Sequence, residues 1–149
     1  MLRPHHMEHI AAFPVSSRPS PRRLGRSIGA VLAGFSAVLI THTGTDAIMH
    51  GAGVFPSDAP LSNELLGLAL AYRVAFTVLG GYVTARLAPR KPREHAYVLG
   101  GLGLLGSGAG LIATLVTAKL GPVWYPLALF LATLPACLLG ARIFEGRAR

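Results

Sequence analysis

Four long apolar segments, separated by short polar stretches, dominate the pattern of hydrophobic and polar positions along the chain. They cover approximately residues 27–49, 65–85, 96–117 and 123–143. Because roughly 20 apolar residues in a helix cross the bilayer core, each segment is long enough to span a membrane. Proline and glycine in the intervening stretches end each helix. The sequence therefore predicts an all-α integral membrane four-helix bundle.

Short similarities between alternate segments suggest a tandem arrangement. Val31–Phe35 (VLAGF) resembles Val98–Leu102 (VLGGL), and Tyr82–Ala88 (YVTARLA) shares Ala-Arg with Leu138–Phe144 (LLGARIF). The bundle could thus consist of two tandem helical hairpins related by an axis along the membrane normal. The two offsets differ, and the longer first loop at 51–63 would account for the difference.

Composition and charge place these helices in a membrane and orient them. Hydrophobic residues make up 52% and charged residues 13% of the chain, and the mean hydropathy is +0.51, whereas a soluble domain carries roughly 25% charged residues. The net charge of +8 comes mainly from three regions that four spans bring to one side: Arg3, Arg18, Arg22, Arg23 and Arg26; Arg86, Arg90, Lys91 and Arg93; Arg142, Arg147 and Arg149. By the positive-inside rule both termini are predicted to be cytoplasmic.

The charged ends complete the predicted organisation. Residues 1–26, rich in proline and arginine, are expected to form a disordered cytoplasmic tail, and residues 144–149 a short basic cytoplasmic end. The four spans between them form one transmembrane domain at residues 27–143, in a bacterial inner membrane. Because the positive charge is explained by topology, the lipid bilayer is the expected partner and nucleic acid is not.

Candidate chemistry lies in the few polar residues inside the predicted spans, since buried ionisable groups are costly in a membrane and usually face protein or water. Arg73 lies near the middle of the second span, and Thr77 follows it on the same face. His42, Asp46 and His50 share one face of the first span, with Glu64 at a similar level. Three interpretations stay open: structural pairing of Arg73 with the first span, a proton or small-solute pathway using Arg73, His42, Asp46 and Glu64, and a metal site.

Enzymatic chemistry has little support in the sequence. It contains no G-x-S-x-G, H-E-x-x-H or P-loop lysine, so no catalytic residue, cofactor or metal is predicted. The weak metal candidates are His42, Asp46 and His50. The single Cys137 excludes an intramolecular disulfide.

A glycine-rich run in the third segment, Gly101 to Gly106, has the spelling G-x-G-x-x-G of a dinucleotide-binding turn. Such a turn requires a strand before it and an acidic residue about 20 positions after it. This sequence has neither a strand pattern before the run nor an acidic residue at that distance. Its spacing favours a helix-packing ridge instead. The residues of that ridge are Gly100, Gly103, Gly106, Ser107 and Gly110, and the first span offers matching small residues at Gly29, Ala33 and Gly34.

The run from Gly80 to Gly103 (GGYVTARLAPRKPREHAYVLGGLG) resembles a pattern in small bacterial inner-membrane proteins with no assigned activity. In that pattern a span ends in Tyr-x-x-Ala-Arg-Leu-Ala-Pro, and His-Ala opens the next span after a basic turn. The matching positions are Tyr82, Ala85, Arg86, Leu87, Ala88, Pro89, His95 and Ala96. The resemblance implies a four-span membrane protein and brings no activity with it.

The expected function is that of a small integral membrane protein that acts through helix–helix assembly, as a homo-oligomer or as a subunit of a larger membrane complex. The alternative is a channel or transporter for protons, ions or a small solute, which would use Arg73 and the cluster of His42, Asp46 and Glu64 on the outer side.

Overall fold

The computed structural model describes residues 21–117 and 121–148, and within them every regular element is an α-helix. The helices are α1 (Pro21–Gly51), α2 (Asn63–Leu87), α3 (Pro92–Val116) and α4 (Trp124–Arg147). All four are long and apolar enough to cross a membrane. Since lipid offers no hydrogen-bond partner, a helix is the form in which an apolar segment satisfies its own backbone. The protein is therefore an all-helical, multi-pass membrane protein.

The helix ends follow local signals. The side chain of Ser62 caps α2 by accepting a hydrogen bond from the backbone N–H of Leu65 at 3.4 Å. Ala88 is extended and ends α2, as expected for the residue before a proline. Lys91 has a positive φ of 50°, and Pro92 opens α3 directly after it.

Each helix extends beyond the apolar segment predicted for it at one end at least, and α1, α3 and α4 do so by a turn or more. α1 begins at Pro21, so six residues that we predicted to belong to the tail are helical, while residues 1–20 of that tail lie outside the described part. At its C-terminal end α4 continues to Arg147. With 31 residues α1 is about 46 Å long, more than the roughly 30 Å of a hydrocarbon core. Its arginine-bearing first turns can thus lie in the headgroup region.

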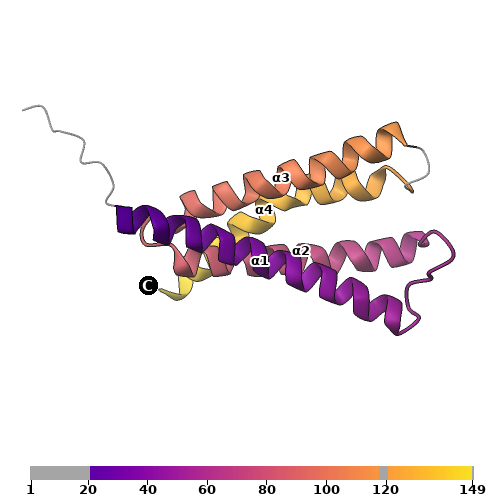
Figure 1. Cartoon of the computed structure of the whole chain (residues 1–149), viewed down its shortest axis with the longest axis horizontal. Helices are drawn as coiled ribbons and strands as arrows, with labels where there is room; N and C mark the ends of the chain where they lie inside the picture. Colours follow the sequence, from indigo (N-terminus) through magenta and orange to yellow (C-terminus); the bar gives the residue numbers. More distant parts are fainter. Residues whose placement is uncertain (1–20, 118–120, 149) are drawn as a thin grey trace, which may run out of the picture.

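The chain packs as two antiparallel pairs, α1 with α2 and α3 with α4, and α2 contacts all three other helices. Figure 1 shows the start of α1, the α2–α3 turn and the end of α4 at one end, which we call the terminal end. The end of α1 and the start of α2, like the end of α3 and the start of α4, lie at the opposite end (Figure 1), which we call the loop end. Among the described residues α1 does not contact α4. The two pairs diverge towards the loop end (Figure 1).

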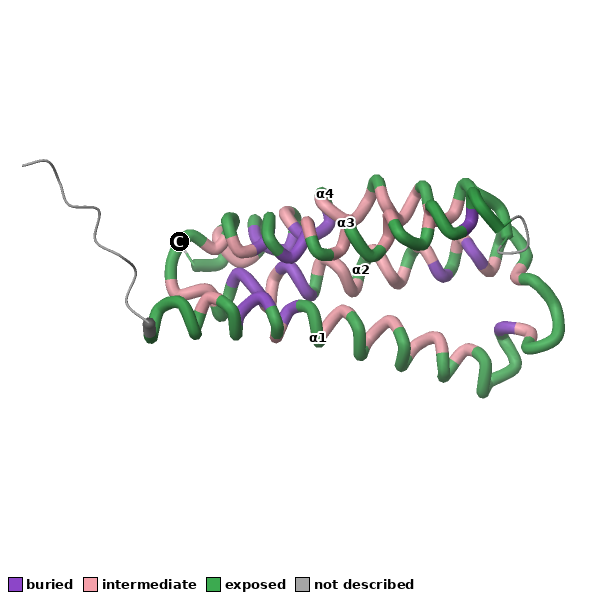
Figure 2. The backbone as a smooth tube through the Cα atoms, turned by 45° about the horizontal axis from the view of Figure 1, so that its top comes forward, coloured by how far each residue is buried: buried purple, intermediate pink, exposed green. Residues whose placement is uncertain are grey.

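Burial follows the same gradient. Most of the buried positions lie in the half of the bundle next to the terminal end, while Phe55, Leu66, Ala69 and Thr114 are buried towards the loop end (Figure 2). They are mostly small residues that let backbones approach, among them Ala30, Gly34, Gly80, Gly81, Thr84, Ala85, Ala96, Gly100, Gly140 and Ala141. Many large apolar side chains point outward instead, which suits a surface in contact with lipid.

The closest approach lies between α2 and α4. A Cβ added at Gly81 would meet the backbone of Cys137, and one added at Gly140 would meet the backbone of Val78, Gly81 and Tyr82. Only glycine allows two backbones to come this near, as in other small-residue crossings of membrane helices. The crossing fixes the two hairpins to each other near the terminal end.

Candidate functional site

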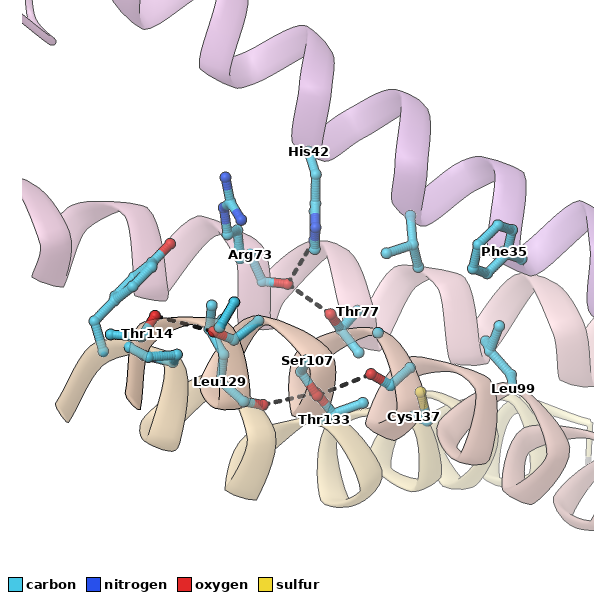
Figure 3. A pocket seen from close by; sticks show the side chains of 17 residues that line it. Phe35, His42, Arg73, Thr77, Leu99, Ser107, Thr114, Leu129, Thr133 and Cys137 are labelled. Carbon is cyan, nitrogen blue, oxygen red and sulfur yellow. Dashed lines mark hydrogen bonds between the residues drawn. The ribbon is translucent and has the colours of Figure 1, made fainter. Parts of the chain in front are cut away.

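A cavity of about 510 Å³ lies between the helices, and residues from all four of them line it. Its wall is largely apolar, with polar groups at a few points (Figure 3). The lining residues are Phe35, Val38 and His42 of α1; Arg73 and Thr77 of α2; Leu99, Gly103, Gly106, Ser107, Gly110, Ala113 and Thr114 of α3; Tyr125, Pro126, Leu129, Thr133 and Cys137 of α4. Its size and mixed lining are those of a small-molecule site.

Arg73 brings a positive charge to this wall and is paired within the protein. Its Nη2 donates to Oδ2 of Asp46 in α1, while the hydroxyl of Tyr72 donates to Oδ1 of the same carboxylate. The side chains of Arg73 and Asp46 are each 28% exposed. Arg73 Nε is buried and has no hydrogen-bond partner among the described residues. The guanidinium is thus held by one oxygen rather than by the two-oxygen fork that it can form with a carboxylate.

His42 reaches the same helix turn from α1. Its Nε2 lies 3.0 Å from the backbone oxygen of Arg73 (Figure 3). Since a carbonyl oxygen only accepts, Nε2 carries the hydrogen, and in the neutral ring Nδ1 is the acceptor. The Thr77 hydroxyl donates to that same oxygen at 2.8 Å. This pair of contacts fixes the imidazole at the cavity wall beside Arg73.

The serine and threonine hydroxyls that α3 and α4 contribute to the wall are turned back onto their own helices. Ser107 donates to Gly103 O at 2.8 Å, Thr114 to Gly110 O at 2.9 Å, and Thr133 to Leu129 O at 2.7 Å. Each hydroxyl proton is therefore used, but each oxygen keeps acceptor capacity. Arg73 and His42 remain the groups of the wall that can carry positive charge.

Not all of the polar residues singled out in the sequence meet at this site. The structure brings together His42, Arg73 and Thr77 at the cavity and places Asp46 behind Arg73. Glu64 is exposed in the first turn of α2 and does not line the cavity. His50 bonds through Nδ1 to the backbone oxygen of Asp46 at 2.8 Å. In residues 21–117 and 121–148, no group of three His, Cys, Asp or Glu side chains converges as metal ligands would.

The glycine ridge of α3 has two kinds of surroundings: one part packs against α4 and the other borders the cavity. Neither part packs mainly against α1. Cβ atoms added at Gly100 and Gly103 would each come within 2.6 Å of an α4 side chain, those of Leu134 and Thr133. Gly106 and Gly110 have nothing within 4 Å and line the cavity with Ser107.

The small residues that we matched to this ridge on α1 have other surroundings. Gly34 packs against α2, where an added Cβ would lie 2.7 Å from Gly80 O. Gly29 faces open space and Ala33 is half-buried. The structure therefore assigns the close approach of α1 to α2 rather than to α3.

Two tyrosines belong to the site, and the sequence analysis singled out neither of them. Tyr72 holds the second oxygen of Asp46, and Tyr125 lines the cavity from the start of α4. The adjacency of Tyr72 to Arg73 was the one available signal, because a charged residue in a span needs nearby polar partners.

Comparison of the chain with known protein families, with curated proteins and with solved structures finds no match.

Proposed function

We propose that this membrane protein binds a small amphipathic solute in the cavity between its two helical hairpins, as the recognition step of a transporter. The observation that carries this proposal is the charged group at the cavity wall: Arg73, paired with Asp46 and next to His42, borders a mostly apolar space. Charged residues inside membrane spans commonly mark solute or proton pathways. We propose no enzymatic activity, catalytic residue, cofactor or nucleic-acid partner.

Two open glycines of α3 give a matched test of this binding. Gly110 lines the cavity and Gly101 does not, while a Cβ added at either would meet nothing within 4 Å. We expect wild-type protein in nanodiscs to bind 1-octanol saturably by calorimetry, relative to empty nanodiscs. Gly110→Phe should weaken this binding at least tenfold, whereas Gly101→Phe should leave it unchanged. Equal affinities in the two variants, or no saturable binding, would refute the proposal.

We further propose that the terminal end faces the cytoplasm of a bacterium and that the chain lies in the inner membrane. Among the described residues, the basic side chains at the bundle ends all lie at the terminal end, whereas the loop end carries Asp58 and Glu64. The positive-inside rule then sets the orientation. An Asp58→Cys variant should react with a membrane-impermeant maleimide added outside intact spheroplasts. Labelling only after lysis would reverse the orientation.

A second candidate function is assembly, as a homo-oligomer or as a subunit of a larger membrane complex. It is favoured by the first turns of α1, where Gly25 and Gly29 form a small-xxx-small pair open to the surroundings. Such pairs allow another helix to approach closely in lipid. Gly29→Ile should then convert a dimer in native nanodiscs to a monomer by mass photometry, while Gly67→Ile, at an open glycine of α2, should not. A monomeric wild type would exclude self-assembly.

A further inference from the structure

The charges around the cavity determine which solute it can hold, and the following argument depends on the binding proposed above. Arg73 and Asp46 neutralise each other across the α1–α2 contact. Of these two residues, Arg73 lines the cavity and Asp46 does not, so a solute comes closer to the cation than to the carboxylate. The buried Nε without a partner lies on that same side chain. The wall therefore offers hydrogen-bond donors suited to an anionic group, but no net positive charge.

An anion entering alone would leave an uncompensated negative charge within the membrane, which is strongly unfavourable. One proton taken up at the same time would restore neutrality. The ionisable groups at or behind the wall are His42 and Asp46 on α1, Tyr72 and Arg73 on α2, and Tyr125 and Cys137 on α4, while the lining residues of α3 carry none. Of these, His42 lines the cavity and belongs to the residue type whose unperturbed charge change falls between about pH 5 and 8.

The contacts of His42 suit that role. Its Nε2–H is committed to the backbone oxygen of Arg73 at 3.0 Å, which leaves Nδ1 to accept the incoming proton. Protonation then adds one positive charge beside Arg73 without breaking the contact that positions the ring. The solute anion would gain two cationic neighbours, and Asp46 would keep its pairing with Arg73.

We propose that the cavity binds an amphipathic monocarboxylate together with one proton, which His42 takes up. The single compensating charge selects a monoanion over a dianion, since a dianion would leave one charge unpaired. The apolar wall formed by residues such as Phe35, Leu99 and Leu129 selects a hydrocarbon tail. No covalent bond of the solute is made or broken: as the carboxylate enters, a hydronium ion of the bulk water gives up a proton, its O–H bond breaks, and an N–H bond forms at Nδ1.

The test uses octanoate with the full chain in nanodiscs, over about pH 6 to 8.5, where this carboxylate stays ionised. For wild type, calorimetry in buffers of different ionisation enthalpy should give one proton taken up per octanoate at high pH. The affinity should then fall tenfold for each pH unit above the pKa of His42 in the protein without octanoate. Affinity independent of pH, with no proton uptake, would overturn the proposal.

Charge-balance variants separate this mechanism from a merely structural role of the residues. His42→Gln should weaken octanoate binding at least tenfold at pH 6. Asp46→Asn leaves Arg73 uncompensated, so octanoate should bind without proton uptake, and the double variant should regain the binding lost in His42→Gln. The control Thr133→Val changes the same wall but no charge, and should keep the proton uptake of wild type. Continued proton uptake by Asp46→Asn, or failure of the double variant to bind, would contradict the proposal.

The two probes, octanol and octanoate, also separate the proposal of proton-coupled binding from the proposal that the cavity binds a solute. Saturable binding of octanol that is blocked by Gly110→Phe, together with octanoate binding that is independent of pH, supports a solute cavity and excludes proton coupling. Absence of saturable binding for both probes excludes the cavity as a solute site altogether. Helical circular dichroism and a single elution peak for each variant confirm that the comparison is between folded proteins.

Discussion

A methyl group placed at Gly140 should separate the two hairpins. A Cβ there would lie 2.5 Å from the backbone N of Tyr82 and 2.9 Å from the carbonyl carbon of Gly81. Ordinary contact begins at 3.4 Å, and the backbone oxygen of Val78 lies closer still to the added Cβ, so the α2 backbone must retreat by more than 0.9 Å, the difference between 3.4 Å and 2.5 Å. Because the obstacle is backbone and not a flexible side chain, one helix has to move as a unit.

The expected cost follows from that displacement. Overpacking a close contact costs about 1–3 kcal/mol, and alanine regains up to about 1 kcal/mol by its higher helix propensity. Gly101→Ala gains the propensity without the clash, because nothing lies within 4 Å of an added Cβ at that position. Gly140→Ala should therefore be less stable than Gly101→Ala by about 1–3 kcal/mol, roughly a five- to hundredfold change in the unfolding equilibrium.

The assay is unfolding of purified protein by SDS in mixed micelles. Far-UV circular dichroism follows helix content, and the single tryptophan, Trp124, reports the loop end of α4. We expect the transition of Gly140→Ala to occur at lower SDS and that of Gly101→Ala at or above the wild-type value. Coincident transitions for the two alanine variants would refute the close α2–α4 approach.

Three further changes test the packing. Arg73→Leu should lower the free energy of unfolding by about 1–3 kcal/mol, because it leaves the Asp46 carboxylate without its cation in a partly exposed setting. Adding Asp46→Leu should recover most of this loss, which a double-mutant cycle of SDS unfolding measures. Thr84→Val should stabilise by about 1 kcal/mol, measured in the same way, because the Thr84 hydroxyl is buried with no partner among the described residues; a lower midpoint would contradict this. Gly103→Leu should lower the SDS midpoint by displacing Thr133 on α4, whereas Gly110→Leu should extend into the cavity and leave the midpoint near wild type.

The helices could be predicted from the sequence because the signal is local. A run of some 20 apolar residues between proline- and glycine-rich stretches leaves a helix as the structure that satisfies the backbone in lipid. The helix ends were harder to predict. The first turns of α1 and the last turns of α4 are polar, and nothing in a hydropathy pattern separates a polar helical turn from a polar tail.

The sequence limits the possible pairing partners of Arg73 to a few residues but does not single out one of them. A charged residue within a span has few possible partners, and Asp46 was one of them. A count of helical rise puts Asp46 further towards the loop end than Arg73. Such a count does not include the direction and length of the arginine side chain, which reaches Asp46 in the structure. Tyr72 completes the group because its ring can extend to the same carboxylate.

Which helix each glycine of α3 faces could not be predicted, for a geometric reason. Helical spacing shows which residues share a face, but not how that face is rotated relative to the neighbouring helices. Gly103 and Gly106 are only about 60° apart around α3. Even so, Gly103 packs against Thr133 of α4 while Gly106 borders the cavity. In a helix that is apolar on every side, hydrophobicity does not decide between such rotations.

The tight crossing and the cavity lie towards opposite ends of the bundle. Towards the terminal end, the facing positions of α2 and α4 are Gly81 and Gly140, so the backbones meet. Towards the loop end the two hairpins diverge (Figure 1), and the large side chains of His42, Arg73 and Tyr125 border the space together with small residues of α3. Replacing the polar residues with small ones should therefore change the cavity volume as well as its charge, and only substitutions of similar size, such as His42→Gln and Asp46→Asn, separate the two effects.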